Sequence, residues 1–327
     1  MDKPIVAISI PTGIGAEIGG YAGDFGYIAR EFSKYFHVVI NPNAVNGGIL
    51  SAINYDMSYL EGYLFDEFLK GSITITPKKQ YETNKIGVIF DCAIPQDILN
   101  IHINTTNALK MVQGIETIAI EYTEKPVGVK CDIENEISLG SLDNSDVILK
   151  SVEKLIKKGA QAIAVVCFFG EDCEDENYSN ANGVDPIGGI EAVISHLITK
   201  EFGLPCAHAP AFLDVDISYK IENPKVSSEI ISSTYLPCVM QGLSIAPSIY
   251  KNKKGEITNS EIEFLIVPYD ALGSKAVLSS YENGTKIVTV KNKTVLNVNS
   301  EKLKIKPYTM VEDYKECLIK IKKALQI

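Results

Sequence analysis

SDVILKSVEKLIKKGAQAIAVVCFF, residues 145–169, decides the fold class, because its pattern indicates an amphipathic helix followed directly by a buried strand. Ser145 and Asp146 can cap the start of this helix, and Gly159 can end it. A second strand-like run, IETIAIEYT, precedes it at residues 115–123. Strand, helix and strand at these lengths predict parallel β-α-β units. We therefore expect an α/β fold of mostly parallel sheets with flanking helices.

The same alternation of apolar runs and helix-like stretches continues along the 327-residue chain. Further strands are expected at PIVAISI (4–10), HVVINPN (37–43), KIGVIFDC (85–92) and TKIVTVKN (285–292). The polar stretch 124–145 carries few apolar residues that could join two cores, which makes it the best candidate for a domain boundary. We expect two lobes around a cleft, an N-terminal α/β lobe of residues 1–130 with a glycine-rich loop and a C-terminal α/β lobe of residues 131–327.

Composition excludes several classes of partner. The formal net charge is −10 and no block of Lys or Arg stands out, so neither nucleic acid nor an anionic membrane surface is an expected partner. No apolar run approaches the roughly 20 residues that span a bilayer, and the N-terminus lacks the pattern of a signal peptide. The seven cysteines are odd in number and lack a regular spacing, which favours a reduced, cytoplasmic protein.

The stretch SIPTGIGAEIGGYAGD, residues 9–24, places five glycines between an expected strand and an expected helix. Bare backbone at such a position can bring N–H groups to a phosphate or carboxylate. The spacing misses the dinucleotide-binding pattern by one residue, and the Lys-Ser/Thr of a P-loop is absent from the stretch. We expect Thr12, Gly13 and Gly15 to contact a ligand. The alternative is a tight turn packed against its own domain.

Other polar turns follow expected strands. Asn43 and Asn46 can bond to a polar ligand or serve as turn residues. Gly273 and Ser274, which follow Asp270, form a second candidate anion-binding turn. The run DCAIPQDILNIHINTTNA, residues 91–108, is rich in short polar side chains beside a strand end. Its candidate site residues are His102, as an acid–base group, and Asn104 and Thr105, as substrate contacts; the alternative for His102 is a structural histidine.

Cys206 and His208 form the sharpest candidate pair. On an extended segment, residues two apart direct their side chains to the same face. That placement suits a thiolate activated by an imidazole, or two ligands of a zinc ion with His196 from the preceding helix as a third. A structural role for both residues is the third alternative.

The chain resembles the DUF3326 family, whose activity is not known. The resemblance is carried by PTGIGAEIGGYAGD, NPNAVNGG, EGYLFDEFLKG, GVDPIGGIEAVISHLITKEFGLPCAHAPA, GLSIAPS and VPYDALGS. These stretches begin at Pro11 and, with the sequence between them, extend the resemblance over nearly the whole chain. The resemblance implies no particular reaction.

A shorter stretch, SVEKLIKKGAQAIAVVC, is similar to a segment of the aspartate/glutamate racemase superfamily. In that superfamily two cysteines from two lobes act as opposed acid and base at a substrate carbon. The resemblance implies that Cys92 and Cys167, each at the end of an expected strand, could take these roles.

These observations together predict a cytoplasmic enzyme that acts on a small polar metabolite bearing a carboxylate or an amide. Isomerase, lyase and hydrolase chemistry through cysteine and histidine all remain open. The alternatives are a zinc-dependent hydrolase that uses His196, Cys206 and His208, and a non-catalytic sensor of a metabolite. The cysteine and histidine chemistry requires no cofactor, whereas the hydrolase alternative requires zinc. A small molecule is the expected partner, and self-association into a homo-oligomer is left open.

Overall fold

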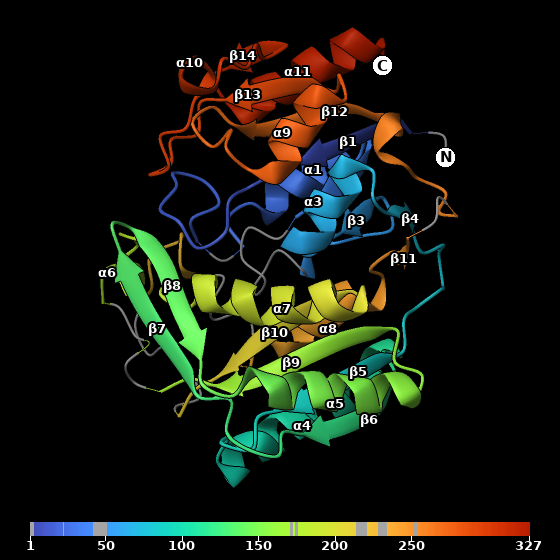
Figure 1. Cartoon of the computed structure of the whole chain (residues 1–327), viewed down its shortest axis with the longest axis vertical. Coiled ribbons are helices and arrows are strands. Elements are labelled where there is room, and N and C mark those ends of the chain that lie inside the picture. The colour runs from blue at the N-terminus through green and yellow to red at the C-terminus, as the bar shows by residue number, and fades with distance from the viewer. Residues whose placement is uncertain are drawn as a thin grey trace.

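The structure is a computed structural model that describes residues 3–21, 23–41, 51–170, 173, 176–213, 221–227, 234–251 and 254–327. It confirms the α/β class, with two mostly buried parallel sheets flanked by helices (Figure 1). No helix within these described ranges is both long and apolar enough to cross a membrane.

The larger sheet has six parallel strands in the order β14–β13–β12–β1–β2–β3. Its strands are β1 (Ile5–Ile8), β2 (His37–Ile40), β3 (Met57–Tyr59), β12 (Ile262–Pro268), β13 (Lys286–Val290) and β14 (Thr309–Val311). In β1, Val6 and Ile8 pack into a different cluster from Ile5 and Ala7. Both faces of the sheet are therefore covered, which is usual for parallel sheets and explains the continuous apolar runs in the sequence.

The smaller sheet has four parallel strands in the order β10–β9–β5–β6. They are β5 (Ile86–Phe90), β6 (Thr117–Tyr122), β9 (Ala162–Phe168) and β10 (Cys206–Ala211). The stretch 145–169 forms α5 (Ser145–Lys157) followed by β9, as predicted, with Gly159 at φ +92° just after the helix. The cap residue is Asn144, one position earlier than expected, and its side chain makes no cap hydrogen bond.

Helices cover both faces of both sheets. On the larger sheet, α1 (Gly26–Ser33) and α11 (Tyr314–Leu325) lie on one face, and α3 (Gly62–Lys70) and α9 (Lys275–Glu282) on the other. On the smaller sheet, α4 (Gln96–Gln113) and α8 (Leu236–Ser244) lie on one face, and α5 and α7 (Gly188–Phe202) on the other.

Each sheet contains a switch point, where the order in which successive strands are added to the sheet reverses. In the larger sheet, the chain runs from β1 through β2 to β3 toward one edge, and from β12 through β13 to β14 toward the other. The helix after β1 and the helix after β12 lie on opposite faces, so the loops at the carboxyl ends of these two strands diverge. Such a switch point is where doubly wound sheets bind ligands. The carboxyl ends of β5 and β9 form the equivalent point of the smaller sheet.

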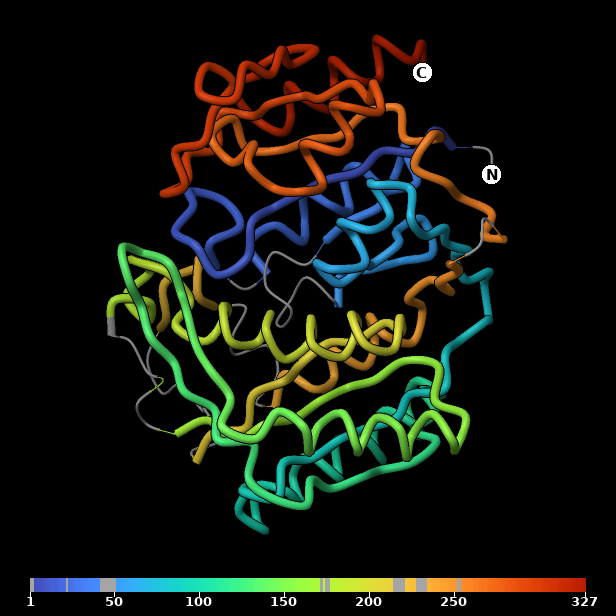
Figure 2. Tube along the Cα trace, viewed as in Figure 1, coloured from blue at the N-terminus to red at the C-terminus, as the bar shows by residue number. Residues whose placement is uncertain are grey.

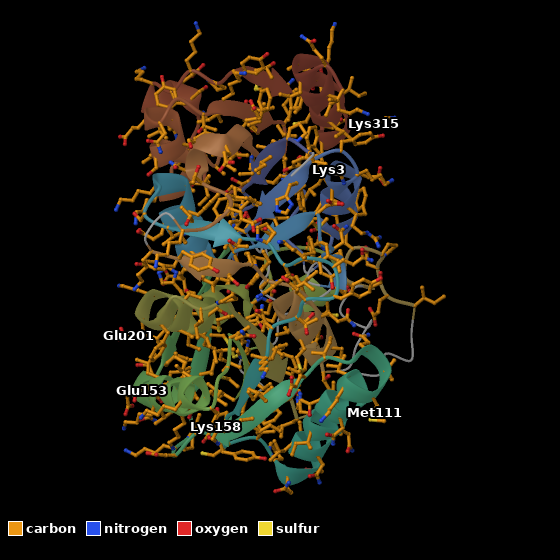
Figure 3. All side chains as sticks on the ribbon, turned by 90° about the vertical axis from the view of Figure 1, so that its right-hand side faces the viewer. Lys3, Met111, Glu153, Lys158, Glu201 and Lys315 are labelled. Carbon is orange, nitrogen blue, oxygen red and sulfur yellow. A yellow bond between two sulfur atoms is a disulfide. The ribbon has the colours of Figure 1, made fainter. Side chains whose placement is uncertain are left out.

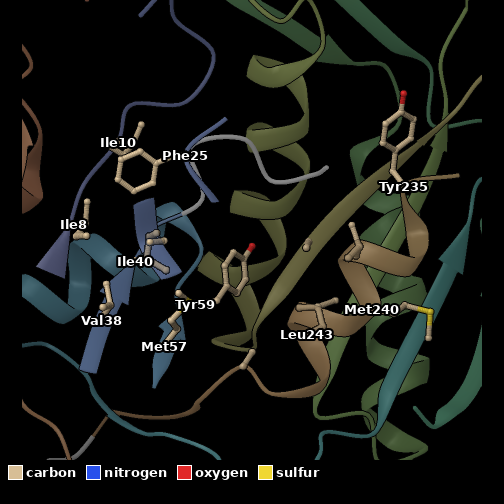
Figure 4. Close-up of a cluster of buried hydrophobic side chains, with 14 of the residues drawn as sticks. Ile8, Ile10, Phe25, Val38, Ile40, Met57, Tyr59, Tyr235, Met240 and Leu243 are labelled. Carbon is tan, nitrogen blue, oxygen red and sulfur yellow. The ribbon is translucent and has the colours of Figure 1, made fainter. Parts of the chain in front are cut away.

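The two sheets share one buried hydrophobic cluster. It joins Ile8, Val38 and Tyr59 of the larger sheet to Met240 and Leu243 of α8, as Figure 4 shows. The Tyr59 hydroxyl also donates a hydrogen bond of 2.7 Å to the carbonyl of Cys206, which links β3 to β10. The two sheets are thus joined by buried contacts. The expected arrangement of two lobes around a cleft stays a prediction.

The chain folds back on itself, so the sheets combine strands from both sides of the expected boundary at residue 130. Strands of residues 5–59 pair with strands of residues 262–311 in the larger sheet, and strands of residues 86–122 with strands of residues 162–211 in the smaller. Figure 2 shows both chain termini at the larger sheet. Viewed from the side, Lys3 and Lys315 lie on this half, and Met111, Glu153 and Lys158 on the other (Figure 3).

The remaining elements are short. β7 and β8 form an antiparallel hairpin, and β4 pairs with β11. Their bounds, with those of the short helices, are β4 (Thr74–Thr76), β7 (Val129–Glu134), β8 (Ile137–Leu142), α6 (Glu176–Ser179), β11 (Ser248–Tyr250), a 3-10 turn (Asn259–Glu261) and α10 (Ser300–Leu303).

A disulfide joins Cys131 of β7 to Cys173, which follows β9. The expectation that all seven cysteines are reduced is therefore corrected for two of them. The pairing arises because the hairpin β7–β8, which the sequence analysis did not predict, places Cys131 beside the segment after β9. The free cysteines are Cys92, Cys167, Cys206, Cys238 and Cys317.

Candidate functional site

Cys206 and His208 lie on β10 with their side chains on the same face, as predicted. Both side chains are fully buried between the sheet and α7, while Ala207 and Ala209 face the opposite cluster. Burial raises the pKa of the Cys206 thiol well above its usual value. The thiol is therefore protonated at neutral pH, and this position does not favour a thiolate nucleophile.

His208 is held as a neutral imidazole by its two hydrogen bonds. Its Nε2 lies 3.3 Å from the backbone N–H of Cys167, which can only donate, so Nε2 must accept. The proton then sits on Nδ1, which lies 3.1 Å from Oε1 of Glu191 on α7. Burial lowers the pKa of His208 to about 3, in agreement with this assignment. The pair ties β10 to β9 and α7, which is a structural role.

The third proposed zinc ligand, His196, is not brought to this pair. Its side chain is about half exposed on α7, with Nδ1 3.7 Å from Oε1 of Glu61, and the bond to Glu61 raises its pKa. Both nitrogens of His208 already have partners. Among the residues that the structure describes, no group of three or more His, Cys, Asp or Glu side chains is arranged to hold a metal ion. The arrangement therefore does not support the zinc alternative.

Cys92 and Cys167 come from neighbouring strands of the same sheet. Cys92 follows β5 and is exposed, whereas Cys167 lies on β9 and is buried, and burial raises its pKa well above the usual value. The racemase scheme draws its two cysteines from two lobes. Their placement here does not reproduce that arrangement.

The switch point of the smaller sheet is closed by the side chain of Asp91. Its carboxylate accepts the backbone N–H groups of Ala93 at 3.1 Å, Val127 at 3.2 Å and Phe168 at 3.4 Å. Asp91 is buried at the end of β5. The polar atoms at this edge are thus used to hold the chain together.

His102, Asn104 and Thr105 belong to the long helix α4, not to a loop beside the strand end. Pro95 precedes the helix and Gly114 ends it in the left-handed region, so the polar run is spread around a helix. His102 is buried, which lowers its pKa to about 4, Asn104 is exposed, and the Thr105 hydroxyl donates to a carbonyl of its own helix. The three residues do not converge on one point, which corrects the expected cluster.

The first half of the glycine-rich loop packs against other parts of the chain. Gly15 donates its N–H to the carbonyl of Glu136 in the β7–β8 turn at 2.9 Å and accepts from Val295 at 3.0 Å. Gly13 has φ +68°, and a Cβ there would lie 3.0 Å from the backbone of Gly189 at the start of α7. The geometry at Gly13 and Gly15 therefore supports the packed-turn alternative. The neighbouring Thr12 is partly exposed.

The second half of the loop places a carboxylate near the N-terminus of α1. Gly19 donates its N–H to Asp24 at 2.9 Å, and Asp24 comes just before Phe25, the N-cap residue of the helix. Burial raises the pKa of Asp24 to about 6. A carboxylate at the position where doubly wound folds bind a phosphate disfavours a dinucleotide, in agreement with the mismatch in the motif.

Two other predicted pairs have different outcomes. Asn43 and Asn46 fall within residues 42–50, which lie outside the described residues. Gly273 and Ser274 are exposed between β12 and α9. The Ser274 hydroxyl accepts the N–H of Val277 at 3.2 Å, so Ser274 caps the helix.

A groove of about 530 Å³ lies at the carboxyl ends of β12 and β13. We call it the strand-end groove, and its lining residues are Asn135, Glu136, Tyr269, Asp270, Lys293, Thr294, Val295 and Asn297. One wall is the turn of the β7–β8 hairpin, which lies beside the loop after β1 (Figure 1). Gly15 bonds to both walls, because its partners are Glu136 and Val295. A Cβ on Gly15 would lie 3.1 Å from Val295 Cγ1 and 3.4 Å from Glu136 Cβ, so the absent side chain lets the two walls approach.

The hairpin turn that forms this wall depends on two residues in the left-handed region. Asn135 has φ +52° and Glu136 has φ +59°. Two consecutive positive φ values are typical of a two-residue type I′ turn, which Asn favours. This turn places the Glu136 side chain at the groove.

Charges of both signs line the groove. Glu136 and Lys293 are exposed, and among the described residues neither takes part in an ion pair. By contrast, Lys291, two residues away, pairs with Glu312 at 2.7 Å. Asp270 is buried, and both its carboxylate oxygens face the N–H of Thr294, at 3.2 Å and 2.9 Å. A smaller cavity of about 280 Å³ shares Glu136 and is also lined by Ile133, Asn177, Asn182, Gly183 and Val184.

Among the groove residues, only Asp270 was singled out from the sequence. The run KNKT after an expected strand, residues 291–294, was a usable signal, because ligands gather at the carboxyl ends of parallel strands. Asn135 and Glu136 carried no comparable signal, since nothing in the sequence indicates that a hairpin from the middle of the chain packs against the first loop.

Three comparisons with known proteins bear on identity. The family described as "Protein of unknown function (DUF3326)" matches residues 5–325. An uncharacterized lipoprotein of Synechococcus sp. is 34% identical over 299 residues, which cover 88% of this chain and 82% of that protein. No solved structure matches the chain, and the likeness to the racemase superfamily gains no support from these comparisons. The match over nearly the full length shows that the chain belongs to the DUF3326 family.

Proposed function

We propose that this protein binds a small polar metabolite in the strand-end groove. The observation that carries the proposal is the position of the groove, at the carboxyl ends of β12 and β13 and beside the loop after β1. The switch point between β1 and β12 is where doubly wound sheets most often hold their ligands.

The size and lining of the groove support the same proposal. Its volume of about 530 Å³ lies within the range of small-molecule sites. The lining offers amide, hydroxyl and charged side chains, and its two exposed charges, Glu136 and Lys293, lack ion-pair partners among the described residues. These two charges suit a ligand that supplies an oppositely charged group to each of them.

An enzyme that uses Cys206 and His208 is the second candidate. The observation in its favour is that both side chains share one face of β10. Their burial weighs against it, because it raises the pKa of Cys206 and lowers the pKa of His208. Once a ligand is known, its turnover should be compared in Cys206→Ser and His208→Gln. Turnover that persists in both variants excludes this chemistry. Binding without any turnover indicates a sensor.

The expected cytoplasmic location stays a prediction. The Cys131–Cys173 disulfide and the name of the Synechococcus relative, a lipoprotein, favour an oxidising compartment instead, because disulfides are rare where thiols are kept reduced. Cells should be quenched in acid and alkylated before lysis. A reduced Cys131–Cys173 pair then supports the cytoplasm, and an oxidised pair the oxidising compartment.

The test of binding is equilibrium dialysis of the protein against a mixture of polar metabolites, read out by mass spectrometry. Lys293→Trp fills the groove, and Lys291→Trp is the matched control outside its lining. We expect a metabolite that the wild type and Lys291→Trp retain and that Lys293→Trp loses. Equal retention by both variants, or no retention by the wild type, would contradict the proposal.

A further inference from the structure

We infer that the ligand of the strand-end groove is a small zwitterion, with a carboxylate that contacts Lys293 and an ammonium group that contacts Glu136. This inference rests on the proposed function and adds the chemical class of the ligand. It follows from the signs, positions and anchoring of the charges in the groove.

The two exposed charges come from opposite walls. Glu136 lies in the turn of the β7–β8 hairpin, and Lys293 lies in the segment after β13. A ligand between the walls therefore meets a carboxylate on one side and an ammonium on the other. A molecule with both charges satisfies the two walls together, whereas a dicarboxylate satisfies one and is repelled by the other.

The balance of charge in the groove favours a ligand that carries an ammonium group. Glu136 and Asp270 contribute two negative charges and Lys293 one positive charge, so the lining has a net charge of −1. Asp270 is buried and cannot approach Lys293 freely, because its carboxylate is bound to the N–H of Thr294. A purely anionic ligand would add to this excess of negative charge.

The backbone that carries each charge is fixed before any ligand arrives. The carbonyl of Glu136 accepts from Gly15, and the carbonyl of Lys293 accepts from Glu17 at 3.0 Å. The N–H of Lys293 donates in turn to the Glu17 carboxylate at 3.3 Å. Anchoring of this kind lowers the ordering cost of binding. The side chains of Asn135 and Asn297 in the same groove can bond to further polar atoms of the ligand.

The experiment is calorimetric titration of the full chain with glycine, alanine, glutamate and lysine as zwitterionic probes, and with succinate and putrescine as probes of one sign. We expect at least one amino acid to bind ten times more tightly than succinate or putrescine. We expect Lys293→Gln and Glu136→Gln to weaken that binding about tenfold, and Lys291→Gln to leave it unchanged. Glu136→Gln keeps the length of the side chain and removes its charge. Lys293→Gln and Lys291→Gln each shorten the side chain by one atom and remove its charge, so the two lysine variants are matched.

The possible failures are distinguishable. If succinate, putrescine or an uncharged compound retained in the dialysis experiment binds as tightly as any amino acid, and Lys293→Trp blocks it, the zwitterion is excluded and the proposed function stands. If an amino acid binds but Lys293→Gln and Lys291→Gln behave alike, the inferred contact with Lys293 is wrong. If no probe binds and dialysis retains nothing, both the inference and the proposed function fail.

Discussion

Removal of the Cys131–Cys173 disulfide should lower the melting temperature by about 6 °C. The bond closes a loop with a sequence separation of 42 residues. The loop-closure relation gives an entropy loss of about 13 cal/mol/K in the unfolded state for such a loop, which stabilises the fold by about 4 kcal/mol at 25 °C. A chain of 327 residues has an unfolding entropy of about 0.7 kcal/mol/K, so 4 kcal/mol corresponds to about 6 °C.

The folded state should change little when the bond is removed, because the hairpin is held by other contacts. Ser138 donates its N–H to the carbonyl of Gly13 at 2.7 Å, and the Ser138 hydroxyl accepts the N–H of Gly189 at 2.9 Å. The hairpin should therefore stay against the first loop and α7 after reduction. The loss of stability comes mainly from the greater freedom of the unfolded chain.

The assay is scanning calorimetry of the wild type with and without a phosphine reductant, beside a double variant with Cys131→Ser and Cys173→Ser. The double variant should melt like the reduced wild type and should not respond to the reductant, while Cys92→Ser, which removes an exposed free thiol, should behave like the wild type. Thiol titration of the unreduced, denatured chain should find five free cysteines. A shift below 2 °C, or seven free thiols, would refute the reasoning.

Three further substitutions test other buried parts of the structure. His208→Ala should destabilise the fold by about 3–5 kcal/mol in urea unfolding, because it removes the imidazole partner of the buried Glu191. His208→Gln should cost much less. Equal costs would contradict the assignment of two hydrogen bonds to the imidazole. Gly189→Ala should cost about 3 kcal/mol, because its Cβ would overlap the carbonyl oxygen of Ser138. Gly188→Ala, with a nearest contact of 3.3 Å, should be tolerated; the reverse order would show that α7 starts elsewhere. His102 has its pKa lowered from 6.5 to about 4, so the native state binds fewer protons than the unfolded state and wild-type stability falls as the pH drops through this window. His102→Leu should remove about 1 kcal/mol per pH unit of that fall in stability. Identical profiles of stability against pH for the two proteins would exclude a contribution from His102.

The parallel α/β character could be predicted because it depends on short-range patterns. α5 and β9 were identified from apolar periodicity within residues 145–169. The order of the strands was not predictable in the same way. Nothing in TKIVTVKN indicates that it lies two strands from PIVAISI, since the pairing of β1 with β12 between them joins distant parts of the chain.

The candidate site shows the same limit at the level of single residues. The shared face of Cys206 and His208 followed from the period of a strand, but their burial depends on α7, and the partner of His208 is Glu191, from a helix that the sequence places only nearby. The polar run around His102 was assigned to a strand end because short polar residues favour turns and caps over helix interiors, whereas in the structure the run forms α4. Gly13 and Gly15 of the first loop were expected to contact a ligand, with a packed turn as the alternative, and in the structure both pack against other parts of the chain. This packing, against the hairpin and α7, requires two long-range partners.

The most direct test of the central claim is hydrogen exchange of the wild type with and without the metabolite that dialysis selects. We expect slower exchange on addition of the metabolite in two segments, residues 130–138 and residues 290–298, which contain the two walls of the strand-end groove. Residues 206–211, which hold Cys206 and His208, should not change. Protection confined to residues 206–211 or to residues 91–108 would place the ligand elsewhere and contradict binding in the strand-end groove.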